Sequence, residues 1–165
     1  MTTAGGPPPA PHHNRNPLTT TGRGGRLLSK LQLPWFTLLP PNGYGVLTTT
    51  GRKSGRARQT CVRAVRRGDR VFVVAIGGRQ AGWFRNLESN PRVGLRIRGG
   101  RFAGQAREVD VDLHREAEQA YCADTGLFEL LESLMHLRGR PRRSRIRQMH
   151  RHWFDTGAPV VIDLE

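Results

Sequence analysis

Between Tyr44 and Val109 the chain consists largely of short strand-like segments, several with alternating apolar and polar residues, and most are separated by turns that contain glycine. The clearest is Arg92–Arg98, where valine, leucine and isoleucine alternate with arginine and glycine, as in a strand with one buried face. Six segments read as strands: Tyr44–Thr50, Arg58–Val65, Arg70–Ile76, Arg92–Arg98, Arg101–Val109 and Ala158–Glu165. Because they show no strand–helix alternation and no GxGxxG motif, a doubly wound dinucleotide-binding sheet is disfavoured. The sequence predicts a mainly β fold: a small barrel of about six antiparallel strands with flanking helices.

The segments outside these strands differ in character. Residues 1–22 are rich in proline and glycine and nearly devoid of large apolar side chains, so they cannot offset the entropy of becoming ordered. We expect a disordered tail there, followed by one domain over residues 23–165. Apolar residues at helical spacing in Arg26–Leu39 predict a helix broken near Pro34, which caps the barrel or, alternatively, touches a membrane surface. Helical spacing returns between Asp112 and Asp155, with Asp112 as the expected N-cap.

Charge and cysteine content narrow the classes of function. The 165-residue chain carries a net charge of +14, which is typical of proteins that bind nucleic acid, anionic lipid or a polyanionic ligand. Its two cysteines, Cys61 and Cys122, lie far apart without the spacing of metal ligands, so we expect neither a disulfide framework nor a metal site. No segment reads as a signal peptide or a membrane span. We therefore expect a cytoplasmic protein, with peripheral membrane contact through residues 26–39 as an alternative.

The stretch Thr48–Arg58, TTTGRKSGRAR, carries the most informative chemistry. A strand ends there in a turn between glycines, and Arg52, Lys53 and Ser54 are displayed together at its tip. Backbone N–H groups, a hydroxyl and several cations make such a turn a candidate anion site. By residue chemistry alone, an exposed basic turn without a ligand is an equal alternative.

A longer series of segments resembles the deazaflavin-dependent nitroreductase family. The matching stretches are VLTTTGRKSGRAR (Val46–Arg58), VFVVAIGG (Val71–Gly78) and WFRNLESNPRV (Trp83–Val93), and RFAGQAREV and the terminal APVVIDLE also fit. The resemblance implies a split β-barrel related to FMN-binding barrels, and it implies coenzyme F420, a deazaflavin whose phosphate and oligoglutamate tail are anionic. It further implies an oxidoreductase of the nitroreductase or quinone reductase type. Such an enzyme passes hydride from the reduced coenzyme to a small electron acceptor such as a quinone, an activated alkene or a nitro compound.

The resemblance also implies which residues hold the coenzyme. The carried-over positions are Arg52, Lys53, Ser54 and Arg58 for the phosphate, Thr60 and Cys61 beside the ring system, Gly77 and Gly78 for close backbone approach, and Trp83 and Asn86 as flanking side chains. For Trp83 and Asn86 the alternative is a structural role, as a core aromatic and an adjacent capping residue.

The sequence departs from the family pattern around the expected substrate. The loop that contains Gly77 and Gly78 is shorter than in many members, Cys61 stands where proline is frequent, and Arg63 stands where some members place an aromatic residue. No dedicated catalytic acid is evident. The candidates for protonating the product are Tyr44, Arg63 and His150.

Three alternatives stay open. The same barrel can hold FMN or haem, which also favour a basic pocket. A nucleic-acid-binding module would use the basic segment that contains Arg142, Arg143, Arg145, Arg147 and Arg151, although its strands lack the interleaved exposed aromatics that stack bases. A non-catalytic barrel could carry an apolar ligand. Both a monomer and a homodimer are compatible with the sequence.

Overall fold

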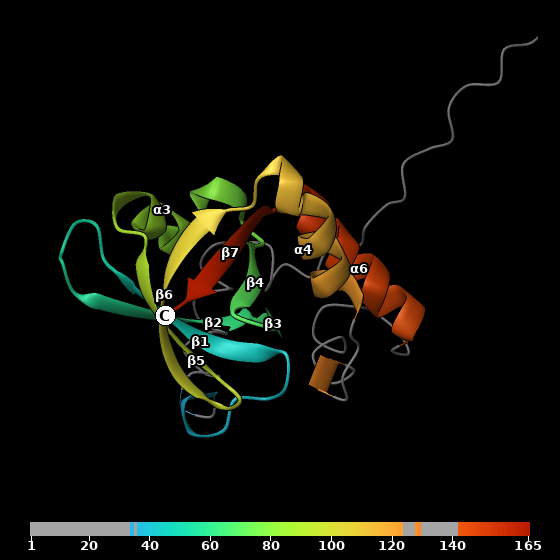
Figure 1. Cartoon of the computed structure of the whole chain (residues 1–165), viewed down its shortest axis with the longest axis horizontal. Helices are drawn as coiled ribbons and strands as arrows, with labels where there is room; N and C mark the ends of the chain where they lie inside the picture. Colours follow the sequence, from blue (N-terminus) through green and yellow to red (C-terminus); the bar gives the residue numbers. More distant parts are fainter. Residues whose placement is uncertain (1–33, 35, 124–127, 130–141) are drawn as a thin grey trace, which may run out of the picture.

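The computed structural model describes residue 34 and residues 36–123, 128–129 and 142–165 (Figure 1). The predicted tail at residues 1–22 lies outside the described residues, as do residues 26–33 of the predicted N-terminal helix; Pro34 and residues 36–38 are helical. In chain order the elements are β1 (Tyr44–Thr50), β2 (Ala57–Arg63), β3 (Val65–Arg67), β4 (Arg70–Ala75), the 3-10 turn η1 (Gly78–Gln80), α3 (Gly82–Ser89), β5 (Arg92–Ile97), β6 (Gly100–Glu108), α4 (Val111–Ala123), α6 (Arg143–Thr156) and β7 (Ala158–Leu164).

The seven strands form one antiparallel sheet in the order β2-β1-β5-β6-β7-β4-β3. A single residue, Ala64, connects β2 to β3, which are the two edge strands. Two edges can be neighbours in the chain only if the sheet curls until they meet. The predicted split β-barrel is therefore confirmed.

The sheet has one strand more than the sequence predicts. The stretch Arg58–Val65, expected to form one strand, is divided at Ala64. Its first part pairs with β1, with Arg63 opposite Tyr44, whereas β3 pairs with β4, with Val65 opposite Phe72. A local sequence pattern shows that this segment is extended, but the choice of partner depends on the closure of the sheet.

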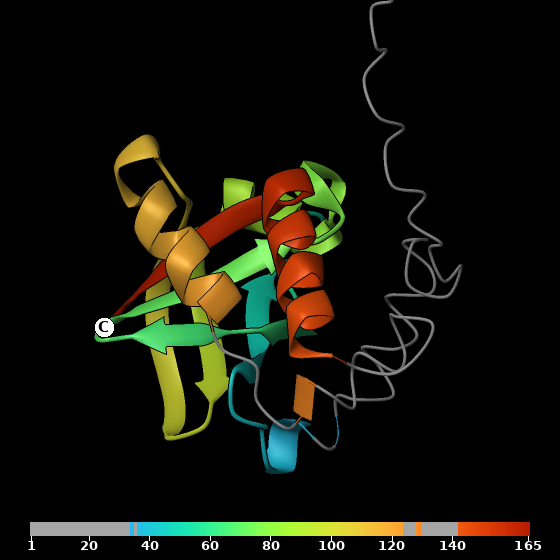
Figure 2. The same ribbon diagram turned by 90° about the vertical axis from the view of Figure 1, so that its right-hand side faces the viewer.

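Strand β4 is buried on both faces, which explains its uninterrupted apolar sequence. Val71 and Val73 belong to the core inside the barrel, whereas Phe72 and Val74 pack on the outer face against the helical layer. Helices α4 and α6 lie side by side over this outer face (Figure 2). Their buried contributions to the outer core are Ala117, Ala120, Tyr121 and Phe154.

The cap of helix α4 lies two residues upstream of the predicted one. Asp110, not the expected Asp112, accepts the N–H of Leu113 through Oδ1 at 2.9 Å, because the helix begins at Val111. This hydrogen bond, followed by the nearby Arg107 guanidinium, lowers the pKa of Asp110. Arg107 Nη1 lies 2.8 Å from Asp110 Oδ2.

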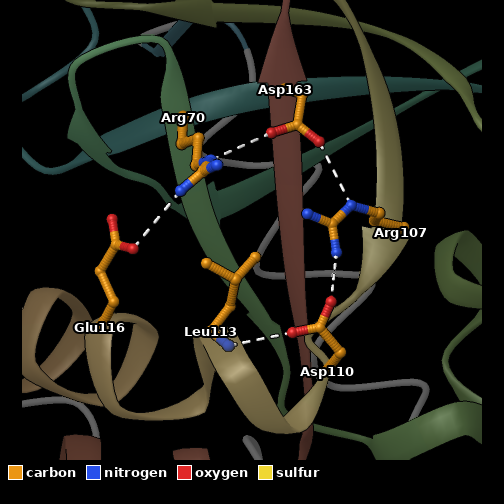
Figure 3. Close-up of polar contacts among 6 residues, drawn as sticks. All are labelled: Arg70, Arg107, Asp110, Leu113, Glu116 and Asp163. Atoms are coloured by element: carbon orange, nitrogen blue, oxygen red, sulfur yellow. Dashed lines mark hydrogen bonds and ion pairs between the residues drawn. The ribbon is translucent and has the colours of Figure 1, made fainter.

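The same arginine joins a network of ion pairs that connects α4 to the sheet (Figure 3). Asp163 of β7 accepts from Arg107 Nε on one side and pairs with Arg70 Nε on the other, each at 3.3 Å. Arg70 also lies 3.4 Å from Glu116 of α4. These groups are partly exposed, so each pair contributes little alone, and the network mainly fixes the position of α4 relative to β4, β6 and β7.

We expect Asp110→Ala to lower the melting temperature near neutral pH, because the first turn of α4 loses its cap. Asp110→Asn is the matched control: its amide oxygen still accepts the Leu113 N–H, so the loss should be smaller. Folding lowers the pKa of Asp110 below its ordinary value of 3.8. The contribution of this carboxylate to the stability of the fold is therefore fully present above pH 3.8, and it is lost as the pH falls through the lowered pKa. The difference between wild type and Asp110→Ala, measured by thermal denaturation, should shrink over that range; a constant difference would contradict this account.

Candidate functional site

The turn between β1 and β2 is closed by its own hydrogen bonds. Gly51 N–H donates to Arg56 O at 2.8 Å, and the N–H groups of Ser54 and Gly55 donate to Gly51 O at 3.1 and 2.7 Å. Arg56 N–H approaches Ser54 Oγ at 3.4 Å. Gly55 has a φ of +65°, a conformation that favours glycine. The GRKSG sequence therefore forms a defined turn, which we call the basic turn (residues 51–56).

A second set of contacts anchors this turn to helix α3. Arg52 N–H donates to Asn86 Oδ1 at 3.3 Å, and Asn86 Nδ2 donates to Thr49 Oγ1 at 3.0 Å. Asn86 and Thr49 are 6% and 2% exposed. Sequence reasoning missed Thr49, although its position in a strand of alternating exposure was the available signal.

These bonds change how the turn can bind an anion. The sequence predicts a cradle of backbone N–H groups, but the N–H groups of residues 51, 52, 54, 55 and 56 already donate within the described part of the chain, which leaves the Lys53 N–H of this turn for a ligand. The side chains instead supply the donors. Arg52, Lys53, Ser54 and Arg58 are exposed, and so is Arg56, a further cation that the sequence interpretation did not include.

The two predicted ring-side residues of β2 point to opposite faces of the strand. Thr60 lies opposite Leu47, a barrel-core residue, and Cys61 lies opposite Val46. Directly opposite residues share a face, so Thr60 and Arg58 lie on the Thr49 side, toward the inside of the barrel. Cys61 instead packs with an outer cluster of aromatic side chains. The structure therefore groups Thr60, and not Cys61, with the basic turn.

The Gly77–Gly78 segment leads from β4 into η1 and then α3. Gly78 has a φ of +62° with open space where a side chain would begin, whereas Gly77 has a φ of −80°, which any residue can adopt. Trp83 is half-buried against the barrel core and makes an edge-to-face contact with Phe84, with ring centroids 6.2 Å apart. Helix α3 thus brings Trp83 and Asn86 onto the same element, next to β1.

The three candidate proton donors lie in the interior, away from the basic turn. Arg63 donates through Nε and Nη2 to Tyr121 O, at 3.3 and 3.0 Å, and forms a buried ion pair with Glu129. Tyr44 is 3% exposed, and the Arg63 guanidinium lies 6.0 Å from its ring. His150 is fully buried beside Tyr121 and Trp153. In this geometry Arg63 joins β2, α4 and the segment at residues 128–129.

Two hollows bounded by described residues lie away from the basic turn. One groove of about 560 Å³ is bounded by residues 38–42 and 96–101, at the end of β1 opposite the basic turn. A second, of about 650 Å³, runs between α4 and α6 and includes Cys122, whose pKa is raised chiefly by burial. Within the described part of the chain, no group of three or more histidine, cysteine or acidic residues is arranged to hold a metal ion.

A family model described as F420H(2)-dependent quinone reductase matches residues 35–124, from the start of the described helix to the end of α4. The chain belongs to the F420H(2)-dependent quinone reductase family. The match includes the segments Val46–Arg58, Val71–Gly78 and Trp83–Val93, and with them the basic turn, but it does not extend to the terminal Ala158–Glu165.

Relatives and solved structures add detail to this assignment. The F420H(2)-dependent quinone reductase Rv1261c of Mycobacterium tuberculosis is 37% identical over 67 residues, which are 39% of this chain and 45% of that protein. This chain therefore matches less than half the length of that curated relative. A protein solved as a domain-swapped dimer has a TM-score of 0.52 at 19% identity, covering 87% of this chain and 94% of its own. A heme binding protein from Mycobacterium smegmatis has a TM-score of 0.50 at 15% identity, covering 74% and 46%. At such identities the two structures share the fold alone.

We expect the fold to depend on the buried Arg63–Glu129 ion pair remaining complete. Arg63→Met should lower the free energy of unfolding by about 3–5 kcal/mol, because it leaves the buried Glu129 carboxylate without its cation. The double variant Arg63→Met/Glu129→Leu should recover much of this loss, since neither charge is then buried. Urea titrations measure the free energy of unfolding of all variants. Arg98→Met, at an exposed arginine, should stay within about 0.5 kcal/mol of wild type. A double variant no more stable than Arg63→Met would contradict the assignment.

Proposed function

We propose that this protein is an F420H2-dependent reductase that transfers hydride to a small electrophilic acceptor, with a quinone as the first candidate. Family membership over residues 35–124 supports the activity. The observation that carries it is the hydrogen-bonded basic turn: Arg52, Lys53, Arg56 and Arg58 are exposed there, and no acidic residue occurs between Val46 and Val65. Such a donor set fits a ligand with several negative charges.

In this proposal the residues divide the work of binding. Arg52, Lys53 and Arg58 hold the anionic tail of coenzyme F420, with Ser54 as a neutral donor. Thr60, Gly78 and Trp83 are the candidates for contact with its ring. When bound, the coenzyme supplies a two-electron hydride, so the protein itself must orient the reactants and keep water away from them.

The buried positions of Tyr44, Arg63 and His150 shift the expected source of the proton. A group that donates a proton must come within hydrogen-bond reach of the product or of a connecting water. These side chains are at most 6% exposed and are packed in the interior. We propose that solvent protonates the product and that the three residues stabilise the fold.

Removing the turn cations tests the proposal. We expect Arg52→Ala and Lys53→Ala each to weaken binding of oxidised F420 by roughly tenfold, the effect of losing one charge-assisted hydrogen bond. Arg98→Ala is the matched control, since it removes one positive charge at the other end of β1. The measurement is a fluorescence titration of purified protein, repeated with FMN and haem.

Each outcome of that titration decides between the alternatives. Tighter binding of F420 than of FMN or haem, with loss confined to the turn variants, supports the reductase. Equal or tighter FMN or haem binding would favour the alternative cofactors. A separate electrophoretic mobility-shift assay tests the nucleic-acid alternative. A shift of duplex DNA that survives moderate salt would favour an interface on α6 and its N-cap, where the exposed arginines are Arg142, Arg143, Arg145, Arg147 and Arg151.

We also propose that the groove at residues 38–42 and 96–101 meets an anionic bilayer surface. Leu38 and Leu39 are 76% and 72% exposed, and Arg96, Arg98 and Arg101 line the same groove. Arg96 Nη2 donates to Leu38 O at 3.3 Å, which holds the leucines beside the arginines. Apolar side chains flanked by cations are typical of surfaces that contact anionic lipid.

No described helix combines the length and the apolar character required to cross a membrane. The proposal concerns surface contact only. A cytoplasmic location, and the choice between monomer and homodimer, stay predictions.

We expect the variant Leu38→Ser/Leu39→Ser to weaken binding to vesicles of phosphatidylcholine and phosphatidylglycerol at least tenfold, because burying each leucine contributes about 1.5–3 kcal/mol. Val111→Ser is the control, since Val111 is 90% exposed but lies at the start of α4. Co-sedimentation measures both. Binding that is unchanged in the leucine variant, or equal on pure phosphatidylcholine, would contradict the proposed contact.

A further inference from the structure

The side-chain amide of Asn86 connects three parts of the molecule. It extends from α3, accepts the Arg52 N–H in the basic turn, and donates to the Thr49 hydroxyl in β1. Asn86 Oδ1 lies 3.3 Å from Arg52 N, and Asn86 Nδ2 lies 3.0 Å from Thr49 Oγ1. Arg52 and Asn86 are 34 positions apart in the chain, so this bridge depends on the tertiary fold.

We propose that Asn86 is a positioning residue that holds the Arg52–Lys53 turn in its anion-binding geometry and acts on the coenzyme through the turn. This inference rests on the proposed F420-dependent function. The amide is engaged on both its oxygen and its nitrogen, and the residue is 6% exposed. Little of it is left to contact a ligand directly.

The chemistry of an amide suits this position. A neutral amide carries an acceptor oxygen and a donor NH2 group in the same plane, which matches the Arg52 N–H on one side and the Thr49 hydroxyl oxygen on the other. An apolar residue of similar size would leave the partly buried Arg52 N–H and Thr49 hydroxyl without these bonds. The turn would then sample other conformations, and a ligand would have to order it on binding.

The hydrogen bond from the Arg52 N–H to Asn86 also determines where the turn presents its cations. With its N–H fixed to Asn86, Arg52 projects its side chain from a defined point at the tip. Lys53 follows immediately and carries the turn N–H that remains available. Both cations are thereby presented before any anion arrives, which is the condition for tight binding of a flexible polyanion.

A double-mutant cycle on coenzyme binding tests the proposal. We expect Asn86→Leu to weaken the affinity for oxidised F420 by roughly tenfold, and Thr49→Val, which removes only the hydroxyl bond, to weaken it less. Leu87→Val is the matched control on the same helix: Leu87 is buried in the barrel core, so this variant loses packing but keeps the bridge. Its affinity should equal that of wild type.

The cycle separates action through the turn from direct contact. If Asn86 acts through the turn, Asn86→Leu should cost less affinity in a Lys53→Ala background than in the wild type, because the two effects are coupled. Fully additive losses would show that Asn86 contacts the coenzyme independently and would overturn the proposal. An equal loss in Leu87→Val would also overturn it, since general destabilisation would then suffice.

A measurement without coenzyme distinguishes failure of the bridge from failure of the proposed function. Hydrogen–deuterium exchange should quicken at residues 51–56 in Asn86→Leu and Thr49→Val and stay unchanged in β4 and β7. Unchanged exchange at residues 51–56 would overturn the bridge even if the coenzyme binds. Faster exchange there, in a protein that does not bind F420, would support the bridge and reject the proposed reductase.

Discussion

The connection through Ala64 places the two edge strands of the sheet on one short stretch of chain, and the other features of the molecule follow from this closure. With its edges brought together, the sheet encloses one core inside the barrel. It leaves an outer face that α4 and α6 cover. Strand β4 lies between the two cores and is buried on both faces.

The two ends of β1 carry different surface chemistry because of this arrangement. At one end the basic turn is anchored to α3 by Asn86, so its cations are mounted on regular elements. At the other end, on the order of 20 Å away, exposed leucines lie beside the arginines of the β5–β6 turn. A coenzyme site and a membrane-facing surface at these two ends would be compatible with each other.

Much of the fold could be predicted from local patterns. The alternation in β5, where Val93, Leu95 and Ile97 are buried, identified the strand and its buried face. A glycine turn is expected between the strand segments Arg58–Val65 and Arg70–Ile76, and Gly68 there has a φ of +58°. The cap of α4 was misplaced by two residues, because Asp110 and Asp112 are equally suitable acids and only the start of the helix distinguishes them.

The sequence by itself determined the strand segments, the basic turn and the family, because alternation, turn glycines and ordered motifs are local properties of the chain. Only the tertiary structure decided that Thr60, and not Cys61, faces the inside of the barrel, that Asn86 holds the turn, and that Arg63 is buried with Glu129. Each of these depends on contacts between residues distant in sequence, such as Arg63 and Tyr121, which are 58 positions apart. Local propensity cannot specify such contacts, since they arise only when the closed sheet and its helices pack together.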